Sequence, residues 1–452
     1  MSYPKSLSYK INRLGNGLFQ KQTLKIIPDK ETITPNSTVS WKLPPNSVID
    51  LRSFNIFFKG KTNRVGTAAG GANHHHSVFP RNTSSLIEQL SISINGYQVE
   101  NIQSYNHLYN ILRDWHSSLE NDTQRFLNNA DPSTEYSIAD DGTVSKRINS
   151  VHTAGAAGFQ TDKKMAITDF IGLMGSSSGE YLDTNLTGEV IITIRFAGAD
   201  VLFKTDDSAA AIDADVVNPT YELSSCYATI SRVMMDPLYY ELMSSQVMNS
   251  GLQIGFTSFS THWGSKTSKT QNFSFNTTGS SIRYVIGTLV YGTNTALSVL
   301  QNTNKTLSFN ASLSSVDQFN QSIYFRKDGV NVDTSAFDVN NVQMSAYPLP
   351  IEEVFLNNEL AFNQQSDVLG GKHFGCHSLA AFQKYYFFHC QSLEFRGSDG
   401  FTISGLDTKN ASANIVFKTK HDGTNTDVYP LCFCAKDMVL NINAGRQVFI
   451  QS

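Results

Sequence analysis

The sequence predicts an all-β protein made of two domains of antiparallel sheet. Three observations support this fold class. Apolar residues alternate with polar ones in both halves of the chain, turn dipeptides separate the alternating runs, and 452 residues exceed what one hydrophobic core usually supports. Composition agrees, because 40% of the residues are hydrophobic and only 16% are charged, which is typical of a packed globular protein.

The alternation is clearest before residue 95. Leu90, Ile92 and Ile94 alternate with polar residues, and the dipeptide Asn95-Gly96 that follows favours a tight hairpin turn. We expect the alternating residues to face the core of a half-buried strand. The same pattern occurs at Phe54, Ile56 and Phe58, at Val190, Ile192, Ile194 and Phe196, at Phe273 and Phe275, at Phe401 and Ile403, at Ile415 to Phe417, and at Leu440 and Ile442.

Three segments carry helical signals. Residues 104–119 place apolar residues at helical spacing after Ser104, a residue type that caps helix starts. Residues 237–248 follow an Asp that can act as N-cap and open with Pro, and residues 350–364 open with Pro350 and have glutamates in the first turn. We expect short accessory helices on a β framework, the second of them marking the junction between the domains.

The layout of these elements occurs twice along the chain. In each half, strands lead through a helix and a polar excursion to closing strands. The excursions, at about 121–163 and about 293–340, are poor in large apolar residues or rich in Asn, Ser and Thr, which predicts exposed insertions. We therefore expect an N-terminal arm at 1–21, a first domain at 22–236, a connecting helix at 237–250 and a second domain at 251–452.

Charge and cysteine content exclude some roles. The formal net charge of −4 is too balanced for a protein whose main task is coating nucleic acid. The first twenty residues lack the apolar stretch of a secretory signal, so we expect a soluble intracellular product. The cysteines are few and odd in number, and we expect reduced thiols buried in strands. They are Cys226, Cys376, Cys390, Cys432 and Cys434.

Three short patterns resemble chemical motifs but fit them poorly. Residues 175–179 match GxSxG around Ser177, yet a nucleophile elbow needs a strand before it and a helix after it, and the flanks predict a loop instead. The run His74 to His76 is expected on a loop, where adjacent histidines cannot all converge on one ion. Cys432 and Cys434 would share one side of a strand as core residues. We expect no enzyme, no metal, no cofactor and no small-molecule substrate.

Three stretches carry a resemblance to a known family. Residues 41–54 read WKLPPNSVIDLRSF, residues 226–242 join a closing strand to DPLYYEL, and residues 403–418 contain ISGLDT followed by a strand. Together they resemble the double jelly-roll major capsid proteins of adenovirus-like, tectivirus-like, virophage, Polinton-like and nucleocytoplasmic large DNA viruses. The virophage and Polinton-like virus proteins are the most similar in pattern. The resemblance covers nearly the whole chain.

This resemblance implies a structural role. It implies two tandem eight-stranded antiparallel jelly rolls with a few short accessory helices, each barrel standing upright in an icosahedral shell. Three chains would form a homotrimer with a pseudo-hexagonal outline, and trimers would then contact one another, with penton and minor capsid or cement proteins as further partners. The expected location is the capsid of the virion, assembled inside the host cell.

The N-terminal segment carries only positive charge before Asp29. We expect an inward-facing basic arm that reaches toward a minor protein, an internal membrane or the genome, although a solvated tail explains the same composition. The residues of this expected arm are Lys5, Lys10, Arg13, Lys21 and Lys25.

Two other functions fit parts of the sequence. A viral spike or carbohydrate-binding β-sandwich would show the same strand pattern, and 11% aromatic content could supply sugar-stacking rings. A hydrolase would need Ser177 as its nucleophile.

Overall fold

The computed structural model describes residues 19–62, 64–67, 74–79, 83–115, 135–138, 144–147, 163–176, 181–206, 220–235, 241, 245, 251–265, 270–291, 306–308, 332–339, 349–350, 388–393, 395–396, 403–409, 414–421 and 428–451. Strands dominate this part of the chain, as the sequence predicts. A search of its helices finds none with the length and apolar character needed to cross a membrane.

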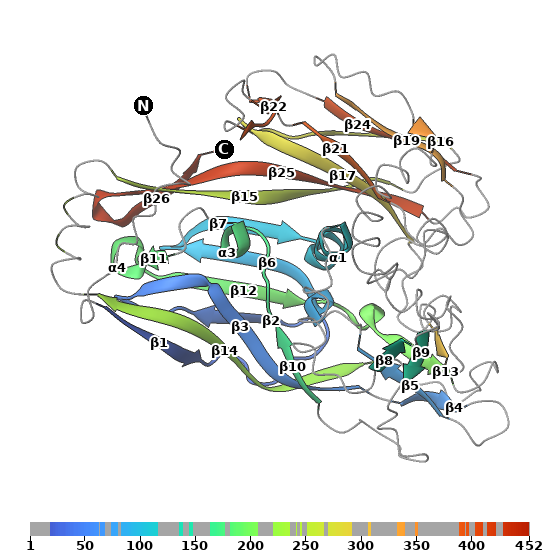
Figure 1. Cartoon of the computed structure of the whole chain (residues 1–452), viewed down its shortest axis with the longest axis horizontal. Coiled ribbons are helices and arrows are strands. Elements are labelled where there is room, and N and C mark those ends of the chain that lie inside the picture. The colour runs from blue at the N-terminus through green and yellow to red at the C-terminus, as the bar shows by residue number, and fades with distance from the viewer. Residues whose placement is uncertain are drawn as a thin grey trace.

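Two sheets enclose the core of a first barrel (Figure 1). The order is β1-β14-β3-β10 in one sheet and β2-β12-β6-β7 in the other. When these eight strands are numbered in chain order, the first sheet contains the first, eighth, third and sixth strands. The second sheet contains the second, seventh, fourth and fifth. Their bounds are β1 Phe19–Ile26, β2 Thr38–Lys42, β3 Val48–Thr62, β6 Ile87–Ile94, β7 Tyr97–Gln103, β10 Lys163–Ile167, β12 Val190–Phe196 and β14 Tyr221–Met235.

A second barrel repeats this order. Its sheets are β15-β25-β17-β21 and β16-β24-β19-β20, so its strands again run first, eighth, third, sixth and second, seventh, fourth, fifth. The two halves of the chain therefore share one topology, although their residues do not align visibly. The bounds are β15 Leu252–Trp263, β16 Thr270–Asn276, β17 Ile282–Tyr291, β19 Val332–Val339, β20 Leu349–Pro350, β21 Phe388–Ser392, β24 Asn414–His421 and β25 Val428–Asn443.

Shorter elements decorate the two barrels. β11 pairs with β3 and β26 pairs with β25, while β8 with β9 and β22 with β23 form isolated hairpins. Among the described residues, three short α-helices lie on the first barrel (Figure 1). The bounds are α1 Tyr105–Trp115, α3 Leu173–Ser176, α4 Thr184–Thr187, β8 Glu135–Ile138, β9 Val144–Arg147, β11 Tyr181–Asp183, β22 Phe395–Arg396, β23 Ile403–Ser404 and β26 Gln447–Gln451.

The predicted alternation becomes the core of the first barrel. Leu90, Ile92 and Ile94 on β6 are all buried, and each lies opposite a β12 isoleucine or valine. The hairpin after β6 is confirmed, because Asn95 and Gly96 both have the positive φ angles, 50° and 78°, of a tight turn that matches strand twist.

Loops from both barrels meet in a small extra sheet. Its order is β18-β13-β5-β4, with β4 at Arg64–Thr67, β5 at His74–Val78, β13 at Phe203–Asp206 and β18 at Thr306–Ser308. β18 follows the third strand of the second barrel, yet it pairs in parallel with β13 of the first. Long connections of the two barrels are thus joined by backbone hydrogen bonds.

The helical predictions had mixed outcomes. Helix 104–119 is confirmed as α1 for its described part, and the hydroxyl of Ser104, the expected cap, accepts a hydrogen bond from Trp263 Nε1 of the second barrel. In the connecting segment only Glu241 and Ser245 are described, and both are helical. The helix expected to begin at Pro350 is wrong at its first residue, because Pro350 belongs to strand β20 and pairs with Thr334 of β19. Residues 351–364 lie outside the described residues.

Two loop predictions were wrong in part. The second expected insertion, 293–340, is too long, because residues 332–339 form β19 between β24 and β20. Its Ser, Thr and Asp content indicated a loop, but pairing with β24 overrides that weak local preference. His74 to His76 lie in strand β5 and not in a loop. Within 121–163, the structure describes the β8–β9 hairpin and the first residue of β10.

Truncating Phe54 should destabilise the first barrel strongly. Phe54 is 1% exposed and contacts the rings of Trp41 and Phe170, with centroid distances of 6.3 and 5.4 Å. Phe54→Ala should lower the free energy of unfolding by about 3–5 kcal/mol, because a large buried ring leaves a cavity. Denaturant unfolding followed by tryptophan fluorescence measures this. The matched control Phe449→Ala removes a ring that is 43% exposed and should change stability by about 0.5 kcal/mol or less. Equal losses in both variants would contradict this packing.

Candidate functional site

The two barrels meet along one junction. β15 of the second barrel lies against β7 and α3 of the first, and β26 also lies against β7 (Figure 1). Buried Phe259, Leu431 and Phe433 from this second-barrel sheet belong to the same apolar cluster as the core of the first barrel. One continuous core therefore connects the barrels, which fixes their relative position.

Polar contacts follow the same junction from end to end. The Ser176 hydroxyl of α3 accepts a hydrogen bond from Thr257 N at 2.8 Å, and Thr261 Oγ1 donates to Gln103 O at 2.7 Å. Trp263 Nε1 donates to Ser104 Oγ at 3.0 Å. At the opposite end Arg446 Nε donates to Asn185 O at 3.2 Å, and Arg446 O accepts from Asn95 Nδ2 at 3.1 Å.

Strand β7 buries one ionisable side chain, that of Glu100. Its Oε2 accepts a hydrogen bond from Leu173 N at 2.8 Å, while Oε1 has no hydrogen-bond partner within the described residues. Burial raises the pKa of Glu100 to about 8, and the Leu173 amide and the Ser258 hydroxyl of β15 lower it only in part. At neutral pH this carboxyl is mostly neutral and lies where both barrels meet.

The loop beside Glu100 is shaped around this carboxyl. Gly172 has φ +80°, a region that favours glycine, and a Cβ at this position would lie 2.3 Å from Glu100 Oε1. No other residue fits without moving the carboxyl or the loop. The loop at Gly172 is thus packed closely against the Glu100 carboxyl.

Most of the described thiols are buried, as expected. Cys226, Cys432 and Cys434 are buried and Cys390 is half-buried; none of these four forms a disulfide, and Cys376 lies outside the described residues. Burial raises the pKa of Cys226 and of Cys434 to about 12, so both thiols stay protonated and poorly nucleophilic. In the described part of the chain, no three His, Cys, Asp or Glu side chains group closely enough to hold a metal ion.

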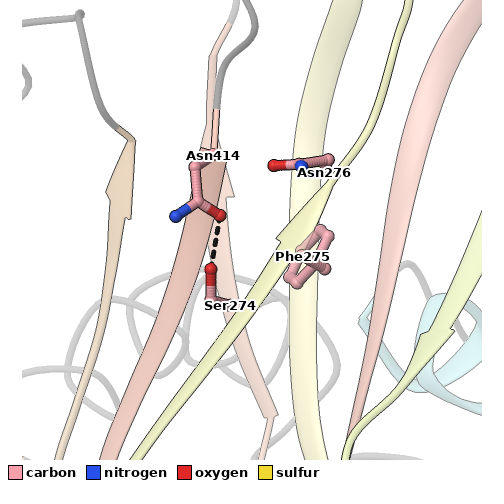
Figure 2. A pocket seen from close by; sticks show the side chains of 4 residues that line it. All are labelled: Ser274, Phe275, Asn276 and Asn414. Atoms are coloured by element: carbon pink, nitrogen blue, oxygen red, sulfur yellow. Dashed lines mark hydrogen bonds between the residues drawn. The ribbon is translucent and has the colours of Figure 1, made fainter.

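An open hollow on the second barrel is polar and shallow. Figure 2 shows Ser274, Phe275 and Asn276 of β16 beside Asn414 of β24, around a volume of about 410 Å³. The Ser274 hydroxyl donates to Asn414 Oδ1, so part of the lining is already hydrogen-bonded. Phe275 is 8% exposed and stacks on His262, which leaves no open ring for a sugar to lie on.

The structure separates the residues of the expected basic arm. Lys21 and Lys25 are part of strand β1, where Lys21 Nζ is 3.4 Å from Asp50 Oδ2 and Lys25 Nζ is 4.3 Å from the ring centre of Tyr227. These two lysines are held on a sheet and not on a free arm. Lys5, Lys10 and Arg13 lie outside the described residues, and their inward role stays a prediction.

The GxSxG pattern is only partly described. Gly175 and Ser176 end the short helix α3, and Ser177 to Gly179 lie outside the described residues. The serine that the structure does place, Ser176, is part of the junction.

Sequence reasoning missed Glu100, Gly172 and Trp263. Glu100 shares its strand with the apolar residues Val99 and Ile102, but nothing in the local sequence indicates that the Glu100 side chain itself is buried. Its partners Leu173 and Ser258 are distant in sequence, so only tertiary structure brings them together.

Comparisons by sequence alone find nothing: no family model matches the chain, and no curated protein matches it. Comparison of the structure with solved structures finds several similar proteins. The Sputnik virophage structure has a TM-score of 0.58 and 13% identity, covering 100% of this chain and 92% of the other. The Faustovirus major capsid protein has a TM-score of 0.57 and 7% identity, covering 94% and 91%. The PBCV-1 virus capsid model has a TM-score of 0.56 and 10% identity, covering 96% and 97%.

These matches span both barrels and agree with the repeated strand order. The chain has the double jelly-roll fold. A jelly roll consists of eight strands in two facing sheets, which is the arrangement found here in each half. At 7–13% identity the likeness shows the fold alone, so the role of this double jelly roll is argued below from its architecture.

The junction should be weakened by alkaline pH through Glu100. Its pKa of about 8 in the folded chain exceeds the ordinary 4.5, so the folded state keeps a proton that the unfolded state releases. This stabilisation is complete below about pH 4.5 and is lost as pH rises through about 8, with a slope of up to about 1.4 kcal/mol per pH unit.

Urea unfolding between about pH 5 and about pH 9 measures this slope. Glu100→Gln should flatten it, because the amide stays neutral at every pH. The control Glu189→Gln removes an exposed carboxylate paired with Lys42 and should leave the slope unchanged. An identical slope in wild type and Glu100→Gln would show that Glu100 does not titrate in this range.

Proposed function

We propose that this chain is the major capsid protein of a double-stranded DNA virus, assembling as pseudo-hexameric homotrimers that tile an icosahedral shell. The observation that carries the proposal is the duplicated topology. Two barrels with the same strand order, held by one core, give six similar units when three chains associate. A pseudo-sixfold tile fits the hexagonal positions of a shell.

The likeness in fold supports the same role. Two of the three similar structures are named as a virus capsid and a major capsid protein, and the chain spans nine-tenths or more of each. We infer that the protein is located in the virion and acts through association, with no catalytic step. Penton and minor capsid proteins are the further partners of this proposal, and the part of the expected N-terminal arm that precedes strand β1, residues 1–18, is its inward-facing segment.

Obligate association implies large contacts. We expect each interface within the trimer to bury more than about 2,000 Å², and trimer-to-trimer contacts to be weaker but repeated many times. A rival carbohydrate-binding role has little support, because the open hollow on β16 and β24 lacks an exposed aromatic ring.

Purified protein should be trimeric. Size-exclusion chromatography with light scattering should give three times the mass of one chain, unchanged on dilution, because obligate oligomers have no stable free subunit. Electron micrographs should show hexagonal outlines. A stable monomer that binds saccharides on a glycan array would contradict the proposal and favour the rival role.

A further inference from the structure

The outer face of sheet β1-β14-β3-β10 combines positive charge with aromatic rings. It is formed by Lys25, Phe57, Lys59, Lys164 and Tyr227, which we name the lysine–aromatic face. Residues next to them on the same strands are buried and point into the core, namely Ile26, Ile56, Phe58, Met165, Cys226 and Ala228, so these five side chains project from the opposite side. Figure 1 shows this sheet on the side of the first barrel away from the second, so no described strand of the second barrel lies over the face.

The two aromatic side chains lie at the centre of the lysine–aromatic face and stack on each other. Tyr227 and Phe57 lie directly opposite on β14 and β3, and their rings stack with a centroid distance of 5.4 Å and an interplanar angle of 21°. Both side chains are half-buried. Lys25 Nζ lies 4.3 Å from the Tyr227 ring centre, so the ammonium group is held beside the two stacked rings by a cation–π contact.

Lys59 and Lys164 lie directly opposite each other on β3 and β10. Both are exposed, and neither makes an ion pair with a described residue. Like charges facing across two strands are destabilising. The same sheet neutralises another lysine nearby, since Lys61 Nζ is 2.8 Å from Glu222 Oε1. The lysine pair is therefore a local cost that no carboxylate among the described residues compensates.

Protection of a sheet edge explains only part of this pattern. Lysines on edge strands prevent unwanted pairing, and β10 is the edge strand beyond β3, so Lys164 fits that role. Lys59 does not, because β3 lies inside the sheet between β14 and β10. An external anionic group that contacts both lysines explains the two together.

We propose that the lysine–aromatic face binds an acidic surface on a second copy of this chain. The inference rests on the proposed self-assembly. The chain has a net charge of −4 although this face carries three lysines without carboxylate partners among the described residues, so its remaining surface is more acidic than the total indicates. Like charges prevent the face from meeting itself, so the contact is heterologous, the kind that closes into rings.

The test compares the association of full-length variants. Lys59→Gln/Lys164→Gln should weaken self-association at least about tenfold in sedimentation velocity at about 50 mM salt, because it removes charge from the contact. Raising salt to about 500 mM should weaken the wild type in the same way. The matched control Lys30→Gln/Lys42→Gln makes the same charge change at two exposed lysines elsewhere and should associate like wild type.

A second variant separates association from folding. Lys59→Glu places a carboxylate opposite Lys164, which should raise the thermal unfolding midpoint while it still weakens association. If wild type and both lysine variants form the same oligomers, the inference is overturned and the trimer proposal stands. If the wild type is monomeric throughout, both are overturned. Binding of a labelled oligothymidylate that is lost in the double variant, with assembly unchanged, would identify nucleic acid as the partner and overturn the inference.

Discussion

Burial of one sheet of the second barrel against the first is the constraint on which the rest of this molecule depends. A lone jelly roll exposes the outer faces of both its sheets, and here β15 and β25 place aromatic and aliphatic residues into the core cluster of their neighbour. Burial of apolar area is the main favourable term in folding, so the relative position of the barrels is set by the force that also folds each of them. The two barrels therefore share one packed core.

The junction also explains why polar residues occur at its boundary. Ser176, Thr261 and Trp263 satisfy backbone or hydroxyl groups that the packing would otherwise leave without hydrogen bonds. Glu100 is different, since one of its oxygens has no hydrogen-bond partner among the described residues and its burial favours the neutral form.

Local sequence patterns were enough to predict those strands in which apolar and polar residues alternate clearly. Leu90, Ile92 and Ile94 with Asn95-Gly96 determine a buried face and a turn within a few residues, and both were found as predicted. β19 was missed because its polar composition is overridden by pairing with β24. Glu100 was missed for the same physical reason: its burial is imposed by Leu173 and Ser258, and no neighbour in sequence reports it.

The parallel pairing of β18 with β13 affects how the chain reaches its native state. β13 is complete once the first half has been synthesised, but β18 follows about a hundred residues later, so a long loop must close before the two strands meet. During that interval β13 offers an unpaired edge to any passing chain. A β18 strand from another copy has the same sequence and fits the same edge, so exchange of this strand between copies competes with closure within one chain.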